Sequence, residues 1–209
     1  MAQARNIPSI LHRGILCHRR AQGLQHVDLA DSNVQALRHG SCVPGTTKTV
    51  HDYVPLYFAT HTPTQYALTR GTDKHGVVID DDQLVFLDVD PLGVFEIEGV
   101  VFTDGNAASA GTRFFSGVEN LCQLDWDIIH RRSGSDPAFR RKKAAEVLVP
   151  DVVPVDLVNR VVIFDELAKG RLRKAIKKYE LRMDERGDRK FAFPTKFPLA
   201  IAPDYYYFR

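Results

Sequence analysis

The apolar runs of this sequence are short and irregularly spaced, and this spacing limits the folds that the chain can adopt. Runs typical of buried strands occur at residues 53–58, 84–89, 94–102, 147–149 and 161–164. Patterns typical of helices occur at residues 6–13, 31–39, 112–121, 137–143 and 166–179, with a further helix starting at residue 62. Because strands and helices do not alternate at the regular spacing of β-α-β units, the sequence predicts an α+β fold.

Two of the expected helices carry recognisable capping residues. Asn6 stands where an N-cap is expected, and Gly14 follows the end of the same pattern. Thr62 precedes a proline, which is favoured at the first helical position, and Gln65 is placed to close a capping box. We therefore expect these helices to start directly after Asn6 and Thr62.

Length and composition restrict the class of protein. The 209 residues suit one domain with a sizeable core. The sequence has no cationic start followed by an apolar run, as in a signal peptide, and no stretch approaches the roughly 20 apolar residues of a membrane-spanning helix. The scattered Cys17, Cys42 and Cys122 argue against a disulfide framework or a structural zinc site, and the histidines lack metal-ligand spacing. We expect a cytoplasmic protein with no bound metal and no membrane segment.

Cations gather in three runs, although the formal net charge is only +2. The runs are Arg131–Arg132, Arg140–Lys143 and Arg171–Lys178. A locally basic face on a nearly neutral protein is compatible with binding a phosphate backbone. A solvated helix face explains the same clustering, and composition alone does not separate the two interpretations.

Glu146 interrupts a run that is otherwise fit to be a core strand. It follows Ala144 and Ala145 and precedes Val147, Leu148 and Val149. Burying a carboxylate costs several kcal/mol unless it is paired or hydrogen-bonded. The residue therefore either lies at an exposed strand end or has a specific role.

Two other segments place polar side chains beside apolar strands. Residues 51–58 put His51, Asp52 and two tyrosines around one strand, and residues 101–107 lead from a strand into an Asp-Gly-Asn turn. Half-buried tyrosines and an ordinary surface turn account for both patterns equally well. The sequence contains no Gly-x-Ser-x-Gly motif and no Gly-rich phosphate loop, which argues against a serine hydrolase and a P-loop enzyme.

Taken together, six segments resemble, in the same order, those of the DarT family of single-stranded-DNA ADP-ribosyltransferase toxins. The segments fall within residues 6–16, 34–44, 51–63, 103–114, 124–126 and 141–149. The most specific are His-Asp-Tyr-Val-Pro at residues 51–55 and Arg-x-x-Ala-Ala-Glu-Val-Leu-Val at residues 141–149. The resemblance implies one ADP-ribosyltransferase-like domain over residues 1–209, with a split, twisted, antiparallel-rich sheet flanked by short helices.

The resemblance also implies roles for individual residues. Glu146 matches the family's catalytic glutamate, and Arg38 matches an arginine that holds NAD and assists proton removal from the base. Ser9 and Cys17 fall at positions that line the NAD site. A second group of residues, on the matching segments, becomes the candidate substrate-binding set. These are His51, Tyr53, Asn106 and Arg113.

The implied activity is transfer of ADP-ribose from NAD to a base, thymidine, in single-stranded DNA, by a toxin that a macrodomain antitoxin neutralises. The chain departs from the family pattern before Asn6, where a strand with a His-x-Thr element is expected and Met1 to Arg5 stand instead. Either the gene start is assigned too late, or this copy binds NAD poorly. Asn106 replaces a histidine, which can alter base preference. The alternatives are an impaired relative that only binds nucleic acid or a partner, and a transferase acting on guanine or RNA.

Overall fold

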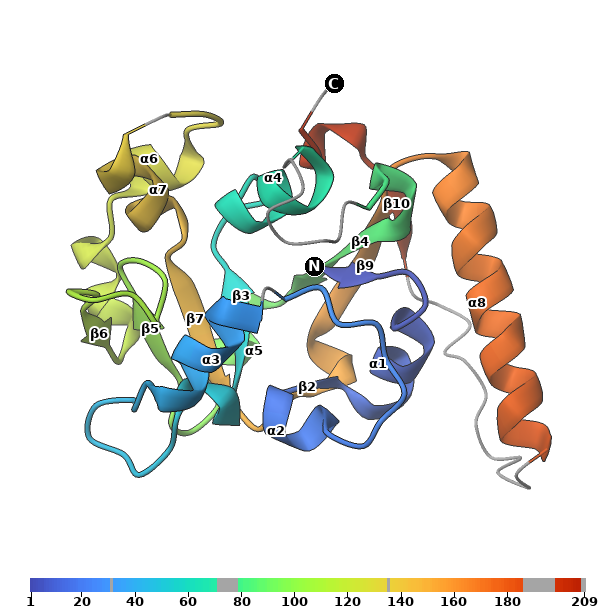
Figure 1. Ribbon diagram of the computed structural model, residues 1–209, viewed down its shortest axis with the longest axis horizontal. Coiled ribbons are helices and arrows are strands. Elements are labelled where there is room, and N and C mark those ends of the chain that lie inside the picture. The colour runs from blue at the N-terminus through green and yellow to red at the C-terminus, as the bar shows by residue number, and fades with distance from the viewer. Residues whose placement is uncertain (31, 71–78, 135, 186–197, 208–209) are drawn as a thin grey trace.

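Within the residues that the structure describes, 1–30, 32–70, 79–134, 136–185 and 198–207, two four-stranded sheets and one strand pair form the framework of this computed structural model (Figure 1). The first sheet has the order β1-β4-β9-β10, built from Ala2–Gln3, Leu84–Val89, Val158–Ile163 and Leu199–Ile201. The second has the order β3-β7-β5-β6, built from Tyr53–Tyr57, Glu146–Pro150, Val101–Thr103 and Phe114–Phe115. The pair joins β2 (Ile15–Leu16) to β8 (Val152–Val153).

The pairing confirms the expected α+β fold with a split sheet rich in antiparallel strands. Among the pairs in the described part of the chain, only β9 and β10 run parallel. Ala2 and Gln3, in the segment that departs from the family pattern, pair with Val85 and Leu84 of β4.

Short helices surround the sheets. The α-helices are α1 (Ile7–Arg13), α2 (His18–Ala21), α3 (Ser32–Gly40), α4 (Pro63–Arg70), α5 (Pro91–Phe95), α6 (Trp126–His130), α7 (Pro137–Lys143) and α8 (Glu166–Glu185). The 3-10 helices are η1 (Val50–Asp52), η2 (Asp81–Gln83), η3 (Val118–Gln123), η4 (Val155–Leu157) and η5 (Pro203–Tyr205). In Figure 1, α8 lies along one edge of the molecule, and β5 and β6 lie along the opposite edge. None of the helices in these ranges is both long and apolar enough to cross a bilayer.

Strand β7 pairs with β3 along one edge and with β5 along the other, and an apolar cluster covers each of its faces. Val147 and Val149 point into an apolar cluster that contains Phe102, and Leu148 points to the other face, into a cluster that contains Tyr53. Successive side chains of a strand alternate between faces, so Glu146 shares the face of Leu148. This strand anchors the candidate site in the core.

Two predicted elements are wrong in part. Residues 94–102 do not form one strand, because Asp90 caps a helix by accepting the backbone N–H groups of Leu92 and Gly93, each at 3.2 Å. Only Val101–Thr103 remains for β5. Residues 112–121 do not form an α-helix, because Phe114 and Phe115 pair with Thr103 and Phe102 as β6.

Two predicted caps are also corrected. Asn6 stands at the N-cap of α1, but its side chain instead forms two 2.8 Å hydrogen bonds with the backbone of Val27 and so fixes a distant loop. Thr62 does cap α4 by accepting the N–H of Gln65 at 3.1 Å. Gln65 does not close the box, because its Nε2 donates to the Tyr205 carbonyl at 3.1 Å. Both side chains make tertiary contacts that local sequence cannot predict.

Candidate active site

Glu146 begins β7, yet only 1% of its surface is exposed. Its Oε1 and Oε2 accept hydrogen bonds from Nη1 and Nη2 of Arg38, at 3.1 and 3.2 Å. Its Oε1 also accepts the backbone N–H of Ala107 at 2.7 Å. The bidentate guanidinium–carboxylate pair and the backbone N–H of Ala107 together replace much of the solvation that the carboxylate loses on burial. Glu146 is therefore a paired interior charge rather than an exposed strand end.

Arg38 reaches this carboxylate from the last turn of α3 and is 9% exposed. The partners are 108 residues apart in sequence, so the fold alone brings them together. The helix is held by His51, whose Nε2 donates to the Gln35 side-chain oxygen at 2.8 Å. The structure thus joins the two predicted catalytic residues directly.

The turn after β5 supplies the third part of the site. The Thr103 hydroxyl donates to the Gly105 carbonyl at 2.7 Å and accepts the Glu146 N–H at 3.4 Å. Asn106 Oδ1 accepts the N–H of Ala108 at 2.9 Å, so this side chain stabilises the turn. The turn places the Ala107 N–H against the carboxylate.

The other predicted residues lie around this centre. Tyr53 is buried in the cluster that contains Ala107 and Leu148. Ser9 is half-buried on α1, and Cys17 is buried among apolar side chains at the start of α2. Among the described residues, no hydrogen bond links Ser9 or Cys17 to the Arg38–Glu146 pair. Arg113 pairs with Asp104, with its Nε 2.9 Å from Oδ2.

Two residues to which the sequence assigned no role complete the surroundings. Tyr57 lies directly opposite Glu146 in the β3–β7 register, and its hydroxyl is 2.8 Å from the Thr64 hydroxyl. Burial raises the pKa of Tyr57, and the Glu146 charge raises it further. Asp104, within the turn that the sequence did single out, is the other. Antiparallel pairing of residues 53–57 with residues 146–150 is the signal that identifies Tyr57.

The basic run at Arg140–Lys143 is largely used for internal contacts. Arg141 pairs with Asp104 and Lys142 with Asp125, at 3.1 and 2.6 Å. Lys143 is buried, its Nζ donates to the carbonyls of Ile129 and Arg131, and burial lowers its pKa. The run on α8 lies at the edge of the molecule opposite β5 and β6 (Figure 1). Three of the four cations at residues 140–143 are therefore engaged in contacts within the protein.

Three histidine rings pack around the base of α3. His51 is buried, its ring stacks on His18 with centroids 4.2 Å apart, and His39 lies 5.5 Å away. Burial lowers the pKa of His51 to about 4, and the positive charges of His18, His39, Arg38 and Arg19 act in the same direction. His51 is therefore a neutral donor to α3 at neutral pH.

Replacing His51 with Gln is expected to reduce the decrease in unfolding free energy between neutral and acidic pH. His51 has a pKa of 6.5 in the unfolded chain and of about 4 in the folded chain. The stability that neutral His51 contributes is therefore fully present above pH 6.5 and is lost as the pH falls to about 4. The difference between the two pKa values corresponds to at most about 3 kcal/mol of unfolding free energy. Urea unfolding of both proteins at pH 7 and pH 4.5 measures it. An equal pH dependence in His51→Gln contradicts the assignment.

The sequence and the fold are both similar to those of known proteins. The family model for DarT, ssDNA thymidine ADP-ribosyltransferase, matches residues 1–207. A DNA ADP-ribosyl transferase of Thermus sp. strain 2.9 is 31% identical over 180 residues, which are 83% of this chain and 84% of the relative. The solved structure of Thermus sp. 2.9 DarT in complex with ADP-ribosylated ssDNA has a TM-score of 0.80 at 27% identity and covers 98% of this chain and 93% of that one.

Two further matches extend the comparison. The structure of Thermus sp. 2.9 DarT in complex with NAD+ has a TM-score of 0.75 at 27% identity, with 98% of this chain and 94% of that chain covered. A DNA ADP-ribosyl transferase-DNA ADP-ribosyl glycohydrolase fusion protein of Thermosipho africanus is 27% identical over 82% of this chain and 43% of its own length. With the family model matching almost every residue and the fold shared along the chain, this protein belongs to the DarT family of ssDNA thymidine ADP-ribosyltransferases.

Proposed function

We propose that this chain transfers ADP-ribose from NAD to thymidine in single-stranded DNA, with Glu146 and Arg38 as its catalytic residues. The observation that carries the proposal is the buried Glu146 carboxylate, held by Arg38 and the Ala107 N–H. The solved Thermus complexes with NAD+ and with ADP-ribosylated ssDNA support the choice of donor and acceptor.

The hydrogen bonds that Glu146 accepts from the protein leave capacity for one more, from a sugar hydroxyl. Oε1 accepts two hydrogen bonds, whereas Oε2 accepts one within the described residues. An ionised carboxylate has about four acceptor sites, so Oε2 retains capacity for a further donor. NAD, when bound, supplies the ADP-ribosyl group and releases nicotinamide. A ribose hydroxyl that reaches Oε2 can therefore donate to it without displacing the contacts of Glu146 to the protein.

Electrostatics assign the roles of the pair. Positive charge develops on the ribose as its bond to nicotinamide lengthens, as in glycoside hydrolysis. A fixed, dehydrated carboxylate stabilises that charge more in the transition state than in the ground state. An arginine guanidinium offers hydrogen-bond donors and no acceptor, so Arg38 is not assigned as a base. Its positive field instead favours loss of the proton from the thymine ring nitrogen.

Further residues are assigned to binding within the same proposal. Ser9, Cys17 and Arg38 line the NAD site; because the Cys17 side chain is buried, it acts by holding the start of α2 in place. A second group of residues serves the DNA site. These are His51, Tyr53, Asn106 and Arg113; the buried His51 and Tyr53 act by holding α3 and the turn in place, which leaves Asn106 and Arg113 as the candidate direct contacts.

The same proposal includes a partner. The Thermosipho relative is named as a fusion of a DNA ADP-ribosyl transferase with a DNA ADP-ribosyl glycohydrolase. An enzyme that removes the modification, joined to one that adds it, supports a toxin role for this chain. We infer a macrodomain antitoxin as the partner, acting in the cytoplasm.

Incubation with labelled NAD is expected to mark single-stranded oligonucleotides that contain thymidine, and Glu146→Ala is expected to abolish the mark. Mass spectrometry of digested DNA identifies the modified base, and parallel RNA and thymidine-free oligonucleotides test the guanine and RNA alternatives. Salt-sensitive binding of oligonucleotides without any transfer supports the impaired-relative alternative instead and rejects the transferase.

A further inference from the structure

We propose that Asp104 is a positioning residue, which closes the loop 104–113 so that the Ala107 N–H orients Glu146. The proposal rests on the proposed function, because it concerns the same carboxylate. It assigns Arg113 and Arg141 to the support of this loop.

Asp104 is 8% exposed and joins both ends of the loop. Its Oδ1 accepts the backbone N–H of Arg113 at 3.0 Å, and its Oδ2 accepts Nε of the same arginine at 2.9 Å. The Asp104 N–H in turn donates to the Arg113 carbonyl at 3.3 Å. Arg141 on α7 donates to Oδ1 at 3.1 Å. One carboxylate therefore binds the loop to itself and to the helix beside it.

The start of the loop is packed tightly against Arg141. A β-carbon added at Gly105 would lie 3.0 Å from Cγ of Arg141 and 3.1 Å from its carbonyl oxygen. The Asn106 carbonyl accepts the N–H of Ser109 and the hydroxyl of Thr112, each at 2.9 Å. These contacts fix the peptide of Ala107, whose N–H meets Glu146 Oε1 at 2.7 Å. A shift of the loop therefore removes a donor from the catalytic carboxylate.

Charge makes Asp104 necessary to this arrangement. Burial alone raises the pKa of Asp104, but hydrogen bonds from Arg113 and the positive charge of Arg141 outweigh it and leave the pKa below its usual value. The carboxyl group thus stays ionised. Without it, the Arg113 and Arg141 cations would face each other unneutralised, and Arg113 is already 60% exposed along its side chain. Loss of the charge favours release of Arg113 into solvent.

Replacing Asp104 with Asn keeps the shape of the side chain and removes its charge. We expect kcat for DNA modification to fall about 10- to 100-fold, since a displacement near 1 Å from reacting groups can cost about that much. KM for NAD should change less than about twofold, because the variant removes no NAD contact. Hydrogen exchange at the Ala107 amide should become faster relative to the amides of β4, whereas general destabilisation accelerates both.

Asp88→Asn is the matched control. Asp88 lies on β4 in the other sheet, where it also holds an arginine, Arg160, and accepts the Tyr205 hydroxyl at 2.9 Å. This variant should leave both kcat and Ala107 exchange unchanged. Asp104→Asn with unchanged kcat, or with unchanged Ala107 exchange, overturns the proposal.

Arg141→Gln keeps the test decisive if Asp104→Asn folds poorly. It removes one anchor and should produce the same change in Ala107 exchange to a smaller degree; if it leaves that exchange unchanged, the proposal fails. In the double variant the Asp104→Asn effect should shrink, because the interaction is already broken. If the wild-type protein labels no DNA, the proposed function fails, whereas Ala107 exchange still tests the loop closure independently.

Discussion

Glu146→Gln is expected to lower ADP-ribose transfer to DNA by at least about 100-fold, the size seen when one electrostatic contact to a transition state is removed. The amide matches the carboxylate in shape and retains an oxygen that can accept the Ala107 N–H. It has no negative charge to stabilise the developing cation on the ribose. The loss should therefore appear in kcat rather than in KM for NAD.

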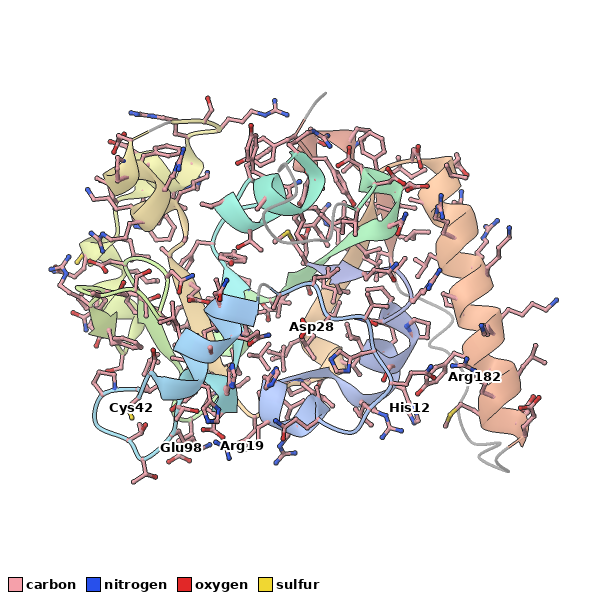
Figure 2. All side chains as sticks on the ribbon, in the orientation of Figure 1. His12, Arg19, Asp28, Cys42, Glu98 and Arg182 are labelled. Carbon is pink, nitrogen blue, oxygen red and sulfur yellow. The ribbon has the colours of Figure 1, made fainter. Side chains whose placement is uncertain are left out.

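Initial rates with labelled NAD and a thymidine-containing oligonucleotide measure the effect. Glu98→Gln is the matched control, because Glu98 is an exposed residue labelled in Figure 2 and has no part in the site. Transfer by Glu146→Gln within about threefold of the wild type would falsify the assignment of Glu146 as the catalytic carboxylate.

Arg38→Met is expected to destabilise the fold by about 3–5 kcal/mol, because it leaves the Glu146 carboxylate buried without its ionic partner. The two residues form a single buried unit, so the double variant Arg38→Met, Glu146→Gln should recover part of the loss. Urea unfolding at neutral pH, with both single variants and the double, gives the coupling free energy.

Arg19→Met provides the control for the stability measurement. Arg19 also pairs with an aspartate, Asp52, but its side chain is 59% exposed, and Figure 2 labels it. An exposed pair of this kind contributes about 0–1 kcal/mol. Equal losses in Arg38→Met and Arg19→Met would contradict the description of the Arg38–Glu146 pair as buried and coupled.

The sequence predicted Glu146 more directly than its partner. A carboxylate within an apolar strand is anomalous by itself, because burial must be compensated. Arg38 ends an ordinary short helix, and nothing within several residues indicates a buried guanidinium. Only the family resemblance identified it, because the contact joins segments 108 residues apart. The roles of both residues stay predictions until the variants are measured.

Local patterns failed where tertiary contacts decided the structure. The expected capping box at Thr62 does not form, because the Gln65 side chain binds the C-terminal tail instead. The basic run before Glu146 suggested a surface for phosphates, yet Lys143 is buried and two of its neighbours are paired with aspartates. The sequence shows which charges are present, whereas only the fold shows which of them are already neutralised.

The central place of β7 affects how such an enzyme can change its target. Glu146 belongs to a strand that has neighbours on both sides and apolar clusters on both faces, so most substitutions there sacrifice folding along with chemistry. The exposed tip of the neighbouring loop, residues 109–111, and β6 lie at the edge of the sheet, where substitutions disturb less of the core. Evolution can therefore adjust the preferred base at the periphery while the reactive group stays locked in the interior.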